Sequence, residues 1–315
     1  MYLSQAFKFY HDWWRYIIGI IMVIAGAFIF SLPHTAALMI KVYNEEADAS
    51  RLNDISYLLT LFEPNLNLIF LLLPFLGGFI FLILALKFLH AQPLKNLTTS
   101  RASIDWKRVA FAFVLIALVN TSLIFTDYFM NPENYQLNFK LVPFLILVVI
   151  GILLIPVQTS FEEYLFRGYL MQFLAVLFKN RWLPLIITSV SFGLLHLQNP
   201  EIDKLGKIAI LYYIGTGFFL GMITLLDEGL ELALGYHAAN NLVTAFLVTA
   251  DWTAFQTHSI FKDMGEPELG FDMLLPFVIV YPLLLLILSK KYGWKNWKEK
   301  LTGKIEPPAR LEITE

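Results

Sequence analysis

The sequence contains no cysteine, and only 15% of its 315 residues are charged. The absence of cysteine excludes disulfides, a thiolate nucleophile and cysteine metal ligands, so any bound metal must be held by His, Asp or Glu. So little charge, with 57% hydrophobic residues, cannot cover the surface of an ordinary soluble domain. The formal net charge of −2 gives no reason to expect binding to nucleic acid. The main solvent of this chain is therefore expected to be lipid rather than water.

Long apolar runs dominate the sequence instead, and several approach the roughly 20 residues that a helix needs to cross a bilayer. They predict an all-α fold, a polytopic membrane helical bundle of about eight transmembrane helices in the lipid bilayer. No small-residue cleavage site follows the first run, which is therefore expected to be a retained helix rather than a signal peptide. The expected helices span residues 14–37, 66–89, 108–129, 141–160, 183–197, 208–226, 230–249 and 271–289.

The loops alternate in charge along the chain. Cytoplasmic loops of membrane proteins carry an excess of Lys and Arg, so the basic segments predict a plasma (inner) membrane protein with both termini in the cytoplasm. The basic positions are Lys8, Arg15, Lys87, Lys95, Arg101, Lys107, Arg108, Lys179, Arg181 and the lysines of 290–304. The acidic positions of the other loops include Glu45, Glu46, Asp48, Asp54, Asp263, Glu266, Glu268 and Asp272.

An acidic pair and an arginine stand at the inner end of the fourth expected helix. An ionisable side chain inside a bilayer costs about 2.5 to 3.5 kcal/mol on insertion scales, so it usually faces a polar cavity. Glu163 and Arg167 are four residues apart and predict an ion pair on one helix face. Glu162 lies about 100° round the helix and is left as a free carboxylate suited to a general base. The alternative is a solvated charge cluster at the membrane edge.

Two histidines, His196 and His237, also lie in apolar surroundings. Phe192 and His196 are four residues apart, as are His237 and Asn241, so each pair shares a helix face. Each histidine can instead be a neutral imidazole bonded to a neighbouring helix, and Asn241 can stabilise an oxyanion or simply bridge helices. Together with Glu162, the histidines can hold a Zn²⁺ ion with an open fourth position, or activate water without a metal. The sequence allows both.

These residues resemble the motifs of the CPBP family, the type II CAAX-prenyl endopeptidases and bacteriocin-processing Abi proteins. The family's motifs EExxxR, FxxxH and HxxxN stand here as Glu162–Arg167, Phe192–His196 and His237–Asn241. The resemblance implies an intramembrane endopeptidase, glutamate- or metal-dependent, whose partner is a peptide or protein substrate at the membrane. It also implies that the residues at Glu162 and His196 activate water, and that those at His237 and Asn241 stabilise the oxyanion or help to bind a metal.

This interpretation divides the chain into three parts and leaves two other functions open. Residues 1–140 form N-terminal transmembrane helices of unassigned role, 141–250 a CPBP-like catalytic core, and 251–315 a loop, the last helix and a basic cytoplasmic tail. Alternatives are an ion-coupled transporter, which needs a continuous polar path across the membrane, and a non-proteolytic immunity or assembly factor.

Straight helices would leave Glu162 and His196 at different depths, so the enzyme interpretation requires a longer or tilted fourth helix or an oblique fifth. The cavity that brings the two residues together should have Phe192 in its wall and open toward the cytoplasm or sideways to lipid.

Overall fold

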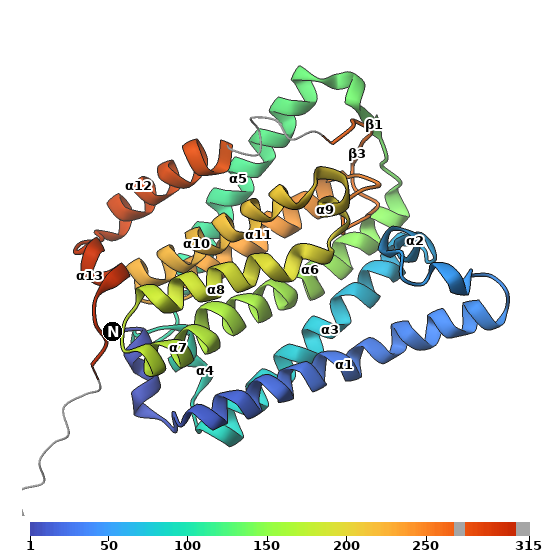
Figure 1. The fold of residues 1–315 in the computed structure, drawn as a ribbon. Helices are drawn as coiled ribbons and strands as arrows, with labels where there is room; N and C mark the ends of the chain where they lie inside the picture. The colour runs from blue at the N-terminus through green and yellow to red at the C-terminus, as the bar shows by residue number, and fades with distance from the viewer. Residues whose placement is uncertain (268–274, 307–315) are drawn as a thin grey trace, which may run out of the picture.

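The computed structural model describes residues 1–267 and 275–306 as a bundle of helices, most of which run in nearly the same direction (Figure 1). Short helices connect them at both ends of the bundle. The all-α membrane fold predicted from the apolar runs is confirmed. The long helices are α1 (Trp13–Tyr43), α3 (Pro64–Ala85), α5 (Trp106–Met130), α6 (Leu141–Glu163), α8 (Trp182–Leu194), α10 (Ile210–Asp227), α11 (Glu231–Leu247) and α12 (Tyr281–Tyr292). The short ones are α2 (Ile55–Thr60), α4 (Leu94–Thr98), α7 (Met171–Phe178), α9 (Pro200–Leu205) and α13 (Trp297–Thr302).

The predicted number of eight spans is not confirmed. Among the described residues, five helices are long and apolar enough to cross a membrane. The expected fifth, seventh and last spans are shorter: the apolar run of α8 ends at Gln198, α11 has 17 residues and α12 has 12. The predicted start of the last helix, at 271–274, lies outside the described residues. The five spans are Trp13–Tyr43, Pro64–His90, Trp106–Met130, Leu141–Phe178 and Lys207–Asp227.

Acidic residues fix where several helices begin. The Glu63 carboxylate accepts hydrogen bonds from the backbone N–H groups of Asn65 and Leu66 at the start of α3, and Asp54 caps α2 in the same way. Asp105 accepts from the N–H of Lys107 at the start of α5. Each carboxylate satisfies N–H groups that have no partner within the helix. These side chains therefore set the ends of the apolar segments.

Glycine lets two pairs of helices approach closely. Gly26 of α1 and Gly77 of α3 face each other, and a Cβ on either would collide with the backbone oxygen of the other. Gly235 of α11 lies against the backbone of Val109 in α5, where a Cβ would also collide. Small residues at such crossings allow backbone contact between membrane helices. Gly235 thereby fixes the depth of α11, which carries His237 two residues later.

The fourth helix is much longer than predicted. After α6 the chain continues through a π-helical segment, Tyr164–Leu170, directly into α7, so that one apolar run covers Leu141–Phe178, 38 residues. The predicted end at residue 160, with the charges at the inner end of the helix, is therefore wrong. Glu163 and Arg167 are fully buried and pair with each other at 3.1 Å. Because each charge has its partner inside the protein, neither residue has to lie at a helix end in contact with water. The acidic pair consequently lies in the interior of the longest helix.

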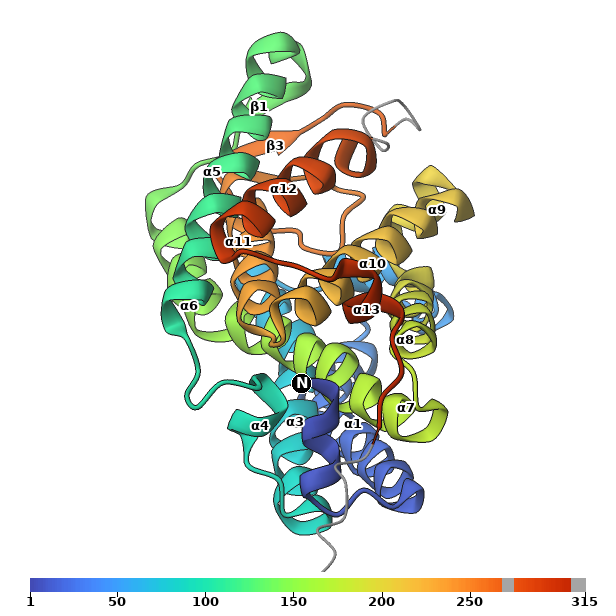
Figure 2. The same ribbon diagram turned by 90° about the vertical axis from the view of Figure 1, so that its left-hand side faces the viewer.

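The two ends of the bundle differ in charge. One, which we call the basic end, gathers the N-terminal segment, the loops at 91–105, 179–181 and 228–230, and α13 (Figure 2). The other, the acidic end, gathers the loops at 44–63, 131–140, 199–209 and 248–267. It carries a small sheet in which β3 (Phe261–Asp263) pairs antiparallel with β1 (Tyr135–Leu137) and parallel with β2 (Val248–Thr249). The loops that alternate in charge along the sequence thus lie at opposite ends of the bundle.

Candidate active site

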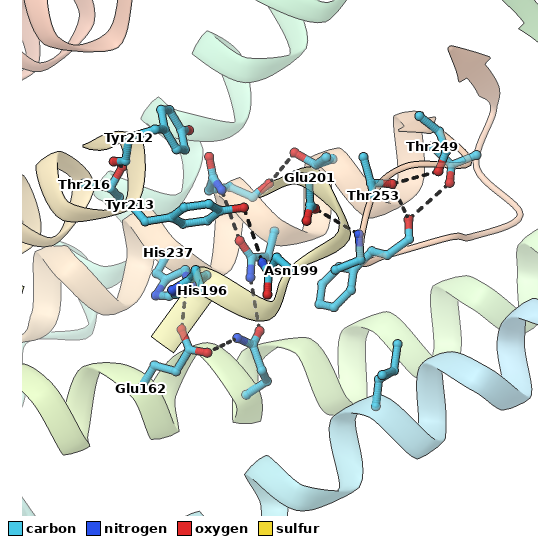
Figure 3. A pocket seen from close by; sticks show the side chains of 18 of the residues that line it. Glu162, His196, Asn199, Glu201, Tyr212, Tyr213, Thr216, His237, Thr249 and Thr253 are labelled. Atoms are coloured by element: carbon cyan, nitrogen blue, oxygen red, sulfur yellow. Dashed lines mark hydrogen bonds and ion pairs between the residues drawn. The ribbon is translucent and has the colours of Figure 1, made fainter. Parts of the chain in front are cut away.

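The three predicted motifs converge on one cavity of about 560 Å³ (Figure 3). Glu162 from α6, His237 from α11 and His196 just after α8 all line it, and Phe192 forms part of its wall. The predicted requirement for convergence is therefore met by the longer fourth helix. Asn241 lines the same cavity one helical turn beyond His237, as its spacing predicts.

Glu163 links the acidic pair to a histidine. Its Oε1 accepts from the Arg167 guanidinium at 3.1 Å and from Nδ1 of His237 at 2.8 Å. Because a carboxylate only accepts, His237 must carry its proton on Nδ1, which leaves Nε2 directed at Glu162, 3.6 Å from its Oε2. The predicted Glu163–Arg167 pair is confirmed. The contact of Glu163 with His237 was not predicted, since nothing in the spacing of two separate helices shows it.

The second histidine is held by its own helix. Nδ1 of His196 donates to the backbone carbonyl of Phe192 at 2.8 Å, so its Nε2 remains free to accept. The imidazole stacks on the Tyr213 ring with centroids 4.1 Å apart, and it also packs on Phe192 at 4.8 Å. Phe192 also lies beside the Arg167 guanidinium, which is 4.2 Å from the centroid of its ring. The centroids of the Phe192 and His237 rings are 6.2 Å apart. The aromatic residue of the FxxxH motif therefore contacts both histidines and the arginine.

A chain of amide side chains leads to Glu162. Asn120 donates to Asn240 at 3.0 Å, and Asn240 to Asn241 at 3.1 Å. Asn241 donates to Gln158 at 3.1 Å, and Gln158 to Oε1 of Glu162 at 2.8 Å. Gln158 is a residue that the motif reasoning missed, although its position four residues before Glu162 on the same helix face is a signal in the sequence. The chain fixes one carboxylate oxygen and leaves the other facing His237.

The donor set of Glu162, His196 and His237 suits zinc by chemistry, because carboxylate oxygens and imidazole nitrogens are its common ligands. Within residues 1–267 and 275–306, no three His, Asp or Glu side chains are placed closely enough to hold a metal ion. His237 also has its Nδ1 committed to Glu163. Zinc at Glu162, His196 and His237 stays a prediction.

The cavity extends from this site toward the acidic end. Glu162 and His237 are buried, at 9% and 8% exposed, whereas Thr244 and the loop residues of the lining from 249 on include partly or fully exposed positions. On the side of the basic end, Tyr164, Leu230 and Leu234 belong to one cluster of buried side chains and do not line the cavity. With the orientation that the basic loops predict, the mouth faces away from the cytoplasm. Of the two predicted openings, toward the cytoplasm or sideways to lipid, only the sideways opening is then compatible with cytoplasmic basic loops.

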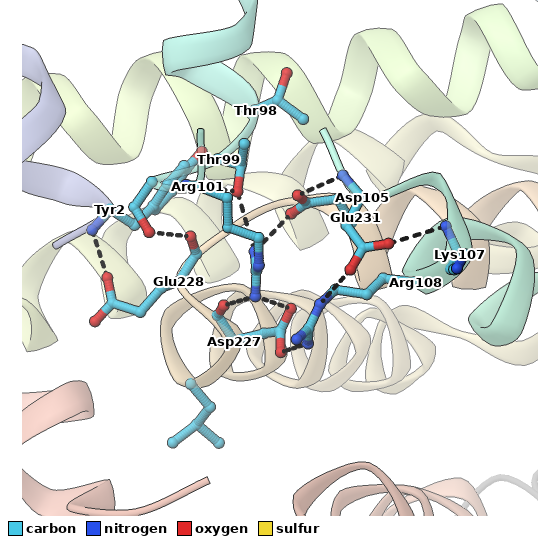
Figure 4. A network of polar contacts seen from close by, with 12 residues as sticks. Tyr2, Thr98, Thr99, Arg101, Asp105, Lys107, Arg108, Asp227, Glu228 and Glu231 are labelled. Atoms are coloured by element: carbon cyan, nitrogen blue, oxygen red, sulfur yellow. Dashed lines mark hydrogen bonds and ion pairs between the residues drawn. The ribbon is translucent and has the colours of Figure 1, made fainter. Parts of the chain in front are cut away.

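A second buried charge cluster, the basic-end network, lies between α4, α5, α10 and α11 (Figure 4). Arg101 pairs with Asp227 at 2.9 Å and with Glu231 at 3.2 Å, and Arg108 pairs with the other oxygen of Asp227. Asp227 also accepts from the Trp294 indole at 3.0 Å. From the sequence alone, the two arginines are predicted only to be basic residues of a cytoplasmic loop. Here they fasten the loop before α5 to the buried acids at the end of α10 and the start of α11.

Comparison with known proteins supports the interpretation of the three motifs. Residues 138–243 match the family model Rce1-like, described as Type II CAAX prenyl endopeptidase Rce1-like. The predicted resemblance is confirmed for this segment. The Rce1-like segment contains all three motifs, together with Gln158.

One curated relative matches beyond chance. Uncharacterized protein YyaK of Bacillus subtilis strain 168 is 32% identical over 167 residues, which cover 53% of this chain and 56% of that protein. The chain thus matches little more than half the length of this relative. No solved structure matches the chain.

Proposed function

We propose that this protein is an intramembrane endopeptidase that hydrolyses a peptide bond of a membrane-associated or lipidated substrate with water activated by Glu162. One observation carries the proposal: the free oxygen of a buried carboxylate faces the Nε2 atom of a histidine inside a cavity lined by all three family motifs. The gap of 3.6 Å between the two polar atoms is longer than a direct hydrogen bond, so both atoms remain available to a water molecule in the cavity. The second histidine, His196, lines the same cavity with its Nε2 free.

The reaction then proceeds by general acid–base catalysis. Oε2 of Glu162 takes a proton from water while the water oxygen attacks the substrate carbonyl, and His196 holds the water through its second O–H. The protonated Glu162 next gives its proton to the leaving nitrogen as the C–N bond breaks, which yields a carboxylic acid and an amine.

The negative charge of the tetrahedral intermediate falls near His237 and Asn241. Because Nδ1–H of His237 binds Glu163, His237 donates Nε2–H to the oxyanion only as the imidazolium, which has taken a second proton from solvent. Asn241 has a second N–H beyond the one that binds Gln158. Glu163 and Arg167 hold His237 in this orientation and do not touch the substrate.

The residues between the site and the basic end favour hydrolysis over transport. Ion coupling across the membrane needs a continuous polar path to the opposite side. Between the site and the basic end, the described side chains Tyr164, Leu230 and Leu234 are buried in one apolar cluster. We therefore favour hydrolysis over transport.

The test is cleavage of a quenched-fluorescent peptide library by the purified protein in detergent, performed in H₂¹⁸O. We expect products whose new terminal carboxylate carries one ¹⁸O from solvent, and no products with the Glu162→Ala variant. A folded parent protein that cleaves no peptide, in detergent or in liposomes, would favour the non-proteolytic immunity or assembly factor. Products formed equally by Glu162→Ala would remove this residue from the mechanism.

A further inference from the structure

The lining of the cavity is charged with one sign only. Besides Glu162, it includes Glu201 and Asp263 near the acidic end, and no Lys or Arg lines it in the described part of the chain. Apart from the two histidines, the other walls are uncharged, with aromatic, polar and aliphatic side chains, Tyr213 and Trp252 among them. A surface of this kind attracts cations and repels carboxylates, because carboxylates and the faces of aromatic rings are both negative.

Glu201 is the acid best placed to bind a ligand. Its Oε1 accepts from the backbone N–H of Ala254 at 2.9 Å, which ties α9 to the loop after α11. Its Oε2 is buried and has no hydrogen-bond partner among the described residues, and the same is true of the neighbouring indole N–H of Trp252. Burial raises the pKa of the Glu201 carboxyl above its usual range, since the charged form lacks a counter-charge. A partner with a positive charge would relieve this cost.

We propose that Glu201 is a substrate-recognition subsite that binds a cationic side chain, lysine or arginine, of the peptide held in the cavity. This inference rests on the proposed function, because it assigns the substrate of the same site. Trp252 contributes an indole N–H that can bind a substrate carbonyl beside the cation. The entering segment comes from the acidic end, where the mouth of the cavity lies.

The geometry limits how far the cation stands from the cleaved bond. Glu201 follows His196 by five residues, so the two Cα atoms are separated by at most about 18 Å even if the chain between them were fully extended. An extended peptide advances about 3.3 Å per residue. The recognised cation therefore lies within about five residues of the scissile bond. Tyr213 contacts both His196 and Asn199, because its ring stacks on His196 and its hydroxyl accepts from Asn199 at 3.3 Å. It therefore links this histidine to the segment just before Glu201.

A purely structural role for Glu201, holding the loop at Ala254, makes a different prediction. Glu201→Gln keeps an oxygen that can accept from the Ala254 N–H and removes only the charge. Asp203 offers a matched control, because it is exposed on the same short helix, outside the cavity lining. Asp203→Asn removes an identical charge from the same end of the protein.

The experiment uses the full chain in detergent with quenched-fluorescent peptides that differ at one position, occupied by Lys, norleucine or Glu, scanned over five residues on each side of the cleaved bond. Binding of the same peptides to the Glu162→Gln variant is measured by fluorescence polarisation. We expect the parent to prefer Lys over norleucine by about tenfold at one position, and Glu to be the poorest. Glu201→Gln should lose this preference, cleaving the Lys peptide no faster than the norleucine peptide, and Asp203→Asn should keep it.

The charge reversal Glu201→Lys should favour the Glu peptide. In the parent, the preference for Lys should grow as the pH rises through the raised pKa of Glu201, because the carboxyl then becomes charged. Cleavage without a Lys preference, or an equal preference in Glu201→Gln, would overturn the subsite. A Lys preference in binding without any cleavage would refute the proposed hydrolysis and leave the subsite standing. Binding of no peptide by the folded Glu162→Gln variant would also count against the subsite.

Discussion

The candidate active site and the basic-end network are both buried clusters of carboxylates with cationic partners, yet they differ in how completely their polar atoms are paired. In the network, both oxygens of Asp227 and of Glu231 accept hydrogen bonds. At the active site, Oε2 of Glu163 and Nε of Arg167 are buried without a partner among the described residues, which also supply no hydrogen bond to Nε2 of His196. Glu162 and His237 of the active site line the cavity of about 560 Å³, whereas the pocket beside the network, lined by residues 101–107, includes neither Asp227 nor Glu231.

The difference shows that buried charge alone does not identify a catalytic site. Saturated pairing holds helices together, and the cost of desolvating the ions is offset only when every partner is present. A site for chemistry needs groups whose lone pairs or protons are still available to a substrate. The two clusters can therefore be separated by experiments that remove one group at a time.

The largest effect on folding should come from the network. Asp227→Ala removes the common partner of Arg101, Arg108 and Trp294, although Arg101 keeps Glu231 and Arg108 keeps Asp105 as partners. We expect a loss of about 1.5 to 3 kcal/mol of stability, in line with hydrogen bonds to a charged group, seen as a lower melting temperature in detergent and a lower yield. The protein that remains folded should cleave peptide at the parent rate per molecule. A variant as stable as the parent would show that the network does not fasten the bundle.

Glu163→Gln should affect both properties. The amide can no longer fix the Nδ1–H tautomer of His237 by charge, so activity per folded molecule should fall by about ten- to a hundredfold, the usual effect of losing a partner that orients a functional histidine. Arg167 would also lose its counter-charge. The variant should therefore melt earlier, as should Arg167→Ala. Unchanged kcat in Glu163→Gln would mean that the contact with His237 is only structural.

Gln158→Leu tests the amide chain with a side chain of similar size. Glu162 then loses the donor to Oε1, and Asn241 loses its acceptor, so we expect activity to fall by several-fold to about tenfold, in line with one hydrogen bond to a charged group. Asn120→Leu, at the far end of the chain, is the control and should change activity less. Parent activity in Gln158→Leu would contradict this role for Gln158.

Removal of metal should have the smallest effect. The proposed chemistry uses only side chains of this chain, so we expect full activity after dialysis against a chelator. Activity that disappears on dialysis and returns with added Zn²⁺ would instead support the predicted zinc set of Glu162, His196 and His237.

The sequence predicted the local pairs well, because they depend on helical spacing. The ion pair of Glu163 with Arg167 and the shared face of Phe192 with His196 follow from residues four apart on one helix. The position of the apolar runs likewise predicted the bundle, because a bilayer requires them.

What could not be predicted depends on contacts between helices. The end of the fourth helix was set too early because a charged run resembles a membrane boundary, whereas Arg167 finds its partners inside the bundle. The contact of His237 with Glu163 joins residues 74 positions apart, and the bond of Glu201 to Ala254 joins residues 53 apart. No periodicity in one segment encodes such contacts.

The most direct test compares Glu162→Gln with Asp227→Asn, one carboxylate from each cluster changed to its amide, by measuring peptide cleavage and melting temperature on the same samples. The account predicts that Glu162→Gln keeps the parent melting temperature and loses about 10²- to 10⁴-fold in rate, whereas Asp227→Asn melts earlier and retains the parent rate per folded molecule. Parent-like cleavage by folded Glu162→Gln would contradict the assignment of this carboxylate as the base.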